Sequence, residues 1–145
     1  AVDFFASKGI YYDLLILLQP TSPLRNSLHV KEALSLYNND LDMVVSVKES
    51  HIASVLCTEN NNGFLEFCLN NSASRRQEMA SYYEYNGAVY IINIEHLKEK
   101  NLSGFTKKKK YVMDDFSSID IDVPLDWLIV ESIMKNQNRI VIGAI

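Results

Sequence analysis

Two aspartates separated by a single residue are the sequence's clearest candidates for metal chemistry. The segment Ser118-Ile119-Asp120-Ile121-Asp122 has the pattern of an extended chain, in which alternate side chains share a face. Asp120 and Asp122 would then point to one side, about 6–7 Å apart. They could converge on Mg²⁺, which typically takes one or two protein carboxylates together with substrate phosphates. The alternative is that Asp122 caps a helix beginning near Pro124, with Asp120 in solvent.

A second group of candidate binding residues lies between Arg76 and Tyr90. An arginine can hold an acidic ligand through paired hydrogen bonds to a carboxylate. The dipeptide Asn86-Gly87 stands directly before an apolar stretch, which suggests a tight turn or a close approach of the backbone to a ligand. A surface arginine and an ordinary hairpin turn would explain the same residues, and the tyrosines of this region could equally be core or interface.

The third candidate is the polar loop that follows Leu14–Leu18. Five consecutive aliphatic residues closed by a loop with two prolines are typical of a fully buried strand of a parallel sheet. In open α/β sheets, ligands bind beyond the carboxyl ends of the strands. The polar residues expected to meet a ligand there are Gln19, Thr21, Ser22 and Arg25. Gln19 offers a donor and an acceptor to a polyhydroxylated ligand, although a stiff connection between strand and helix is the alternative.

The elements that position these residues begin with a strand, a helix and a second strand, which form a right-handed βαβ unit. They are expected over residues 12–18, 27–37 and 43–47, after the end of a helix at residues 1–8. The βαβ rhythm is lost after residue 48. The expected elements there are a hairpin over residues 52–69, a strand at 88–93, a short helix at 94–100, an edge strand within 105–113, an extended segment at 117–122 and a last helix from Pro124.

The composition is that of an ordinary soluble globular domain, with 145 residues, 48% hydrophobic and 22% charged. A net charge of −4 gives no reason to expect nucleic acid, and the basic block Lys107–Lys110 is expected to be a solvated loop. No apolar run approaches the roughly 20 residues of a membrane span. Two cysteines without metal-like spacing favour a reducing, cytoplasmic location.

Taken in series, the three candidate regions resemble the N-acylneuraminate cytidylyltransferase family, the CMP-sialic acid synthetases. Gln19-Pro20-Thr21-Ser22-Pro23-Leu24-Arg25 looks like the loop motif of that family. Arg76-Gln77, followed by Asn86-Gly87-Ala88-Val89-Tyr90, looks like its Arg-Gln and Asn-Gly-Ala-hydrophobic-Tyr block. The segment 118–122 looks like its metal-binding segment. Each motif alone is weak, but the three in this order over nearly the whole chain are specific.

The resemblance implies an α/β fold: a three-layer α/β/α Rossmann-like nucleotide-diphospho-sugar transferase architecture with a mixed sheet. Residues 1–145 would be the C-terminal part of a single domain, with sugar-binding and dimer-facing excursions within residues 49–116. The implied reaction transfers CMP from CTP to the anomeric hydroxyl of a nine-carbon 2-keto acid sugar, with Mg²⁺, and releases pyrophosphate. The implied catalytic and metal residues are Asp120 and Asp122. The implied substrate-binding residues are Gln19, Arg76, Asn86, Gly87, Tyr90 and, across the interface of a homodimer, Phe105.

The sequence also departs from the family pattern. The nucleotide-binding N-terminal segment of the family, with its first strand and glycine-rich loop, has no counterpart, so we expect the 145-residue chain alone to be inactive. Ala80 replaces a proline, and His51-Ile52-Ala53 lacks a His-Pro pairing, which weakens the expected contacts across the dimer. The alternatives are the same reaction on pseudaminic or legionaminic acid, or a non-catalytic binding or dimerisation domain derived from such an enzyme.

Overall fold

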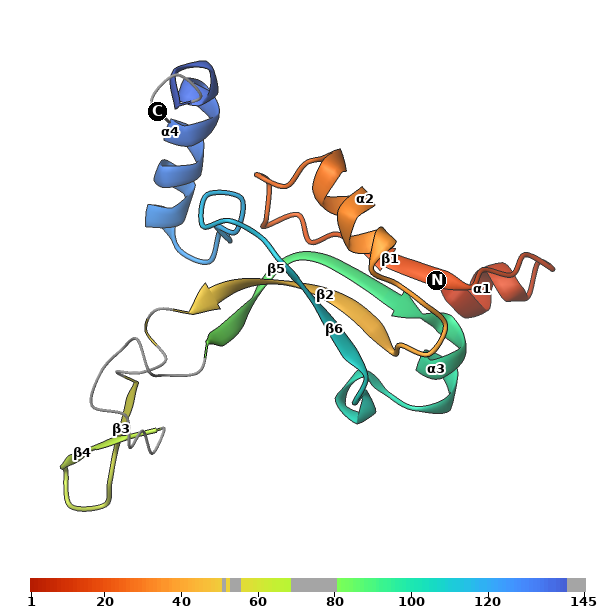
Figure 1. Ribbon diagram of the computed structural model, residues 1–145, viewed down its shortest axis with the longest axis horizontal. Coiled ribbons are helices and arrows are strands. Elements are labelled where there is room, and N and C mark those ends of the chain that lie inside the picture. The colour runs from red at the N-terminus through yellow and green to blue at the C-terminus, as the bar shows by residue number, and fades with distance from the viewer. Residues whose placement is uncertain (51, 53–55, 69–80, 141–145) are drawn as a thin grey trace. The chain divides into compact units, whose positions relative to one another are not determined.

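The computed structural model describes residues 1–50, 52, 56–68 and 81–140 (Figure 1). The chain divides into two compact units. The first comprises residues 1–48 and 85–145, and the second is Glu49–Glu84. All of the candidate site residues that the structure describes lie in the first unit.

The first unit is built on a mixed four-stranded sheet. Its strands are β1 (Leu14–Leu17), β5 (Tyr82–Asn93), β2 (Met43–Ser50) and β6 (Lys108–Val112), in that spatial order. Strand β1 pairs antiparallel with β5, whereas β2 pairs parallel with β6. Figure 1 shows β5 running opposite to β2 as well. The predicted α/β class and mixed sheet are therefore confirmed.

The prediction that the apolar run 14–18 is a fully buried strand of a parallel sheet is wrong. Strand β1 is neither fully buried nor paired in parallel. In the described part of the chain its only neighbour is β5, which runs antiparallel to it. Ile16 and Leu17 are 39% and 43% exposed. A continuous apolar run indicates a strand that is apolar on both faces, but it carries no information about the direction or number of the neighbouring strands.

The helices begin close to where the sequence places them. They are α1 (Val2–Ala6), α2 (Ser27–Ser35), α3 (Ile94–Glu99) and α4 (Pro124–Ile140), with a short 3₁₀ turn at Leu102–Gly104. Helix α2 is capped by Asn26, whose side-chain oxygen accepts hydrogen bonds from the backbone N–H groups of Leu28 and His29. Within the described residues, no helix is both long and apolar enough to cross a membrane.

Two apolar clusters cover the opposite faces of the sheet. Alternate residues of β2 point to opposite faces, so Val44 packs in one cluster with Ala33 of α2, while Val45 packs in the other with Phe105. Leu97 of α3 packs against the second cluster. Helices from both sides of the sheet therefore contribute to the core.

Asp42, directly before β2, holds several elements together. Its carboxylate is 1% exposed. It lies 2.8 Å from Lys100 Nζ and 2.9 Å from His96 Nδ1, and it accepts hydrogen bonds of 2.8 Å from the backbone N–H groups of Thr106 and Lys107. The bond from Lys100 and those from the backbone hold the pKa of the Asp42 carboxyl well below its usual range. These contacts fix the start of β2 against α3 and the approach to β6.

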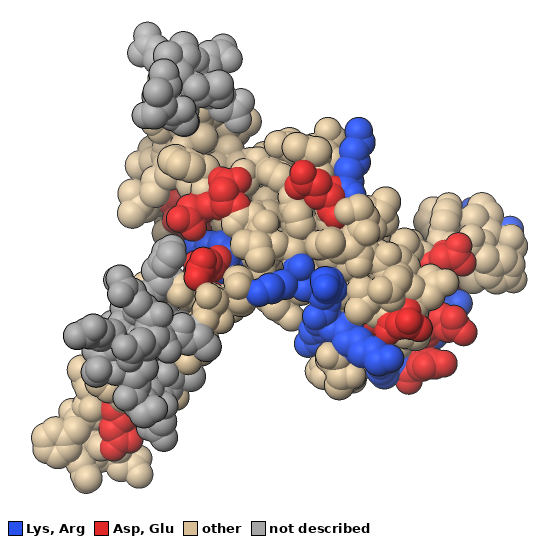
Figure 2. All heavy atoms as spheres, in the orientation of Figure 1, with Lys and Arg blue, Asp and Glu red and all other residues tan. Residues whose placement is uncertain are grey.

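The prediction that the basic block Lys107–Lys110 is a loop is also wrong. Lys108–Lys110 form most of strand β6 rather than a loop, because the segment pairs in parallel with β2, Lys110 opposite Val45. These lysines remain exposed on the edge strand, and Figure 2 shows a run of lysine and arginine side chains in the region where Figure 1 draws β6. Lysines on an edge strand discourage the pairing of a further chain.

The second unit contains the predicted hairpin. Strands β3 (Cys57–Glu59) and β4 (Leu65–Phe67) pair antiparallel, with Thr58 opposite Glu66. Gly63 has a positive φ of 80°, which a turn can use and which other residues rarely adopt. The predicted hairpin is therefore confirmed over residues 57–67, whereas residues 53–55 and 69 of the expected strands lie outside the described residues.

Candidate functional site

Three segments that are far apart in the sequence meet next to the carboxyl end of β1. The loop after β1 contacts the segment 118–122, since Ile121 donates its backbone N–H to the carbonyl of Thr21 at 2.9 Å. The Ser22 hydroxyl lies 3.1 Å from Asp120 Oδ1 and 3.2 Å from the carbonyl oxygen of Asn86. The loop, strand β5 and the aspartate segment thus form one polar cluster.

The shape of the loop is set by its own arginine. Arg25 donates hydrogen bonds from its guanidinium to the carbonyl oxygens of Gln19 and, at 2.8 Å, of Ser22. The Ser22 N–H in turn donates to the Gln19 carbonyl at 3.3 Å. Arg25, which the sequence places where a ligand is expected, therefore serves at least in part to close the loop.

Gly87 shows how closely the cluster is packed. Its φ is +72°, and a Cβ atom built there would lie 2.4 Å from Gln19 Oε1, 3.1 Å from Asp120 Oδ2 and 3.2 Å from Ser22 Oγ. The Gln19 side chain therefore reaches across the backbone of Gly87, beside the Asp120 carboxylate. One residue from each of the three motifs lies within this space, so the structure brings together the predicted Gln19, Gly87 and Asp120.

Asn86 of β5 links two of the three segments. Its side chain is buried, its Nδ2 donates to Ser118 Oγ at 2.8 Å, and its Oδ1 accepts from the Ala88 N–H at 3.3 Å. These bonds hold the aspartate segment against the bend in β5. The described contacts of Asn86 are therefore structural, and its predicted contact with substrate stays a prediction.

Tyr90 lies on β5, opposite Leu17 of β1. It is half-buried, and its ring packs edge-to-face with that of Tyr85, with 6.4 Å between the ring centroids. Burial, followed by the nearby Tyr85 and Asp120, raises the pKa of the Tyr90 hydroxyl. Tyr90 therefore keeps its proton at neutral pH and can act as a hydrogen-bond donor.

Asp120 and Asp122 differ in their surroundings. Asp120 is half-buried within the cluster, whereas Asp122 is exposed. The turn before α4 is capped by Asp126, whose Oδ2 accepts from the N–H groups of Asp122 and Val123 at 3.0 and 2.9 Å. Asp126 thus folds back onto the N–H groups that precede α4, and no described hydrogen bond gives the Asp122 side chain the capping role considered for it.

The segment is not a strand, and it does not form a complete metal cage by itself. The expected extended segment 117–122 is wrong at its start, because residues 115–118 form a turn, and residues 119–122 belong to no helix or strand. The Ile121 N–H joins this segment to the loop. Among the described residues, no group of three or more His, Cys, Asp or Glu side chains could hold a metal. A cation bound here would need ligands from its substrate, as Mg²⁺ commonly does.

Of the remaining predicted residues, one lies outside the described part of the chain and one lies away from this cluster. Arg76 lies outside the described residues. Phe105 lies in the second apolar cluster with 3% exposure, and the Lys100 ammonium sits 5.7 Å from its ring centroid. Such a buried ring offers no free face to a ligand, so the structure gives the predicted substrate contact of Phe105 no support.

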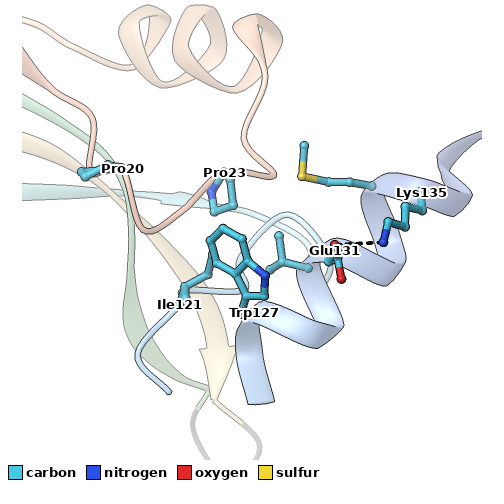
Figure 3. Close-up of a pocket in the computed structure, with 8 residues that line it drawn as sticks. Pro20, Pro23, Ile121, Trp127, Glu131 and Lys135 are labelled. Carbon is cyan, nitrogen blue, oxygen red and sulfur yellow. Dashed lines mark ion pairs between the residues drawn. The ribbon is translucent and has the colours of Figure 1, made fainter. Parts of the chain in front are cut away.

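An apolar pocket of about 410 Å³ lies on the other side of the same loop, against α4 (Figure 3). Its lining residues are Pro20, Pro23, Ile121, Trp127, Val130, Glu131, Met134 and Lys135. Glu131 and Lys135 form a 2.9 Å ion pair at its wall. No pattern in the sequence indicates this pocket, because its lining residues come from two segments about 100 residues apart.

The fold and the candidate site define an α/β protein with a polar cluster at the end of an apolar strand. The chain is 35% identical over 133 residues to the N-acylneuraminate cytidylyltransferase of Escherichia coli O18:K1:H7, covering 88% of the chain and 31% of that relative. It is 38% identical over 118 residues to the N-acylneuraminate cytidylyltransferase of Streptococcus agalactiae serotype V, covering 78% of the chain and 28% of that relative. It is also 28% identical over 146 residues to the CMP-N,N'-diacetyllegionaminic acid synthase of Legionella pneumophila, covering 94% of the chain and 61% of that relative.

The chain is therefore homologous to a segment of the N-acylneuraminate cytidylyltransferases, and the resemblance indicated by the three motifs is confirmed. No family model matches the chain. The chain spans about a third of the length of the two cytidylyltransferases and 61% of the Legionella relative.

Proposed function

We propose that the protein transfers CMP from CTP to the anomeric hydroxyl of a sialic-acid-like nine-carbon sugar, releasing pyrophosphate. The observation that carries this proposal is the meeting of Gln19, Gly87 and Asp120, each from a different motif, in one cluster. The names of the relatives support CMP transfer to sugars of this class. They include both N-acylneuraminate and diacetyllegionaminate enzymes, so legionaminic and pseudaminic acids stay as alternative acceptors.

Asp120 and Asp122 are proposed to hold Mg²⁺. The donor set fits, because carboxylate oxygens are the ligands that Mg²⁺ prefers, and only one oxygen of Asp120 accepts a hydrogen bond in the described contacts. When bound, the cation would neutralise charge that develops as pyrophosphate leaves. Gln19 would orient the sugar through its amide, and Tyr90 would donate a hydrogen bond from its hydroxyl. Such positioning is most of what phosphoryl transfer requires.

Other parts of the proposal rest on the family. They are the three-layer architecture, the homodimer, the contact of Arg76 with an acidic sugar and the cytoplasmic location. Helices that contribute to the core on both faces of the sheet support the first of these. The inactivity of the 145-residue chain alone also stays a prediction.

The test is an assay of pyrophosphate release from CTP by the complete protein, with N-acetylneuraminic, N,N'-diacetyllegionaminic and pseudaminic acids as acceptors. We expect Asp120→Ala to lower kcat by several orders of magnitude, since it removes a proposed metal ligand. Asp40→Ala is the matched control, because Asp40 is exposed and lies before β2, outside the cluster. A protein that releases no pyrophosphate with any of these sugars, or an Asp120→Ala variant as active as the control, would instead support a non-catalytic domain.

A further inference from the structure

Ser22 is fully buried, with 0% exposure, yet it is a polar residue in a surface loop. Its hydroxyl oxygen lies between two acceptors, Asp120 Oδ1 at 3.1 Å and the Asn86 carbonyl at 3.2 Å. A serine hydroxyl has a single proton to donate. A carboxylate makes the stronger hydrogen bond, so the Ser22 hydroxyl donates to Asp120 Oδ1 rather than to the Asn86 carbonyl.

We infer that Ser22 is the positioning residue that orients the Asp120 carboxylate towards a divalent cation. This inference rests on the proposed function. The bond to Oδ1 leaves Oδ2 as the oxygen nearest Gly87, 3.1 Å from where a Cβ of that residue would stand. Oδ2 thus faces the space beside Gln19, and it is the oxygen that binds the cation.

The position of Ser22 is itself fixed by the loop. Arg25 donates to the Ser22 carbonyl at 2.8 Å, and the Ser22 N–H donates to the Gln19 carbonyl at 3.3 Å. These bonds fix the backbone of Ser22, so its hydroxyl can change place only by rotation of the side chain about χ1. Hydrogen bonds to a ligating carboxylate orient it, and their loss typically weakens metal affinity 10–100-fold.

The chain offers a closely matched control in Ser46. Its side chain is 1% exposed, and its hydroxyl oxygen accepts a 2.7 Å hydrogen bond from the Val89 N–H. Ser46→Ala therefore also removes a buried, hydrogen-bonded hydroxyl from the first unit. The difference is that its described bond goes to strand β5 and not to Asp120, so a comparison with Ser22→Ala separates positioning of the carboxylate from loss of packing.

The experiment measures Mn²⁺ affinity of the complete protein with CTP present, by electron paramagnetic resonance, well below the melting temperature of each variant. We expect Ser22→Ala to raise the Mn²⁺ Kd about 10-fold, and Ser46→Ala to leave it within twofold. Ser22→Cys, whose thiol is a weak donor, is expected to match Ser22→Ala and serves if the alanine variant does not fold. Equal Kd values for the wild type and the two Ser22 variants, or equal changes for Ser22→Ala and Ser46→Ala, overturn the inference.

Asp120→Asn distinguishes this inference from the proposed function. If that variant loses Mn²⁺ affinity and activity while Ser22→Ala behaves like Ser46→Ala, only the inference fails. If Asp120→Asn changes neither property, or if the wild type shows no Mn²⁺ binding, the proposed metal site fails and the inference fails with it.

Discussion

Gly87→Ala is expected to disturb both stability and sugar binding. The backbone at Gly87 has φ +72°, and a residue with a Cβ pays about 1–2 kcal/mol to adopt that left-handed conformation. In addition, the new Cβ would stand 2.4 Å from Gln19 Oε1, a distance at which the glutamine must move. Asp120 Oδ2 and Ser22 Oγ, at 3.1 and 3.2 Å, leave little room on the other sides.

Gly9→Ala is the control for the cost of placing a residue with a Cβ atom in the left-handed backbone conformation. Gly9 has a similar φ of +77°, but a Cβ there would meet nothing within 4 Å. Both variants therefore include the conformational penalty of about 1–2 kcal/mol, and only Gly87→Ala adds displacement of Gln19. We expect urea denaturation to show a larger loss for Gly87→Ala, and the KM for the sugar to rise in that variant alone.

A double variant completes the test of Gly87. Gln19→Ala removes the group that the new Cβ would strike, so the two changes together are expected to destabilise less than the sum of their separate effects, a coupling of about 0.5–3 kcal/mol. If Gly87→Ala and Gly9→Ala lose equal stability and the double variant is additive, then Gln19 does not lie over Gly87 and the described site is wrong.

Two further predictions concern the fold. Asp42→Asn is expected to lower the melting temperature at pH 7. Because hydrogen bonds from Lys100 and from backbone N–H groups depress the pKa of Asp42, its carboxylate stabilises the fold above the unfolded pKa of about 4 and loses that effect as the pH falls through the lower folded value. The melting temperatures of variant and wild type should thus converge in acid, and a constant difference would contradict this. Asn26→Ala removes the cap of α2 and is expected to cost about 1 kcal/mol in urea denaturation, with Asn38→Ala as a control outside the helix.

The sequence predicts elements better than it predicts their neighbours. Apolar periodicity and capping residues locate α2 and the start of α4, since these signals are local. The place of β1 at a sheet edge, and its antiparallel partner β5, follow from pairing between residues about 75 positions apart, such as Leu17 and Tyr90. Asp42 was missed for the same reason, because its partners lie 54 to 65 residues further along the chain.

The candidate site was predicted in a different way. Spacing alone left structural alternatives open for each motif, and the meeting of the motifs was expected only because their order resembles a family. The structure adds what residue types could not indicate: Ser22 and Asn86 are buried and hold the segments together. Serine and asparagine in a polar loop give no signal of burial before their partners are known.

Asp120 and Ile121 are consecutive residues that serve different surfaces. Asp120 lies in the polar cluster with Ser22, whereas Ile121 lines the apolar pocket with Trp127 of α4 (Figure 3). The Ile121 N–H is also bound to Thr21 of the loop. The wall that Ile121 contributes to the pocket beside α4 is therefore one peptide unit away from the Asp120 carboxylate. The apolar pocket and the proposed metal site thus share the backbone of the segment 120–121, and the Ile121 N–H fixes that backbone to the loop.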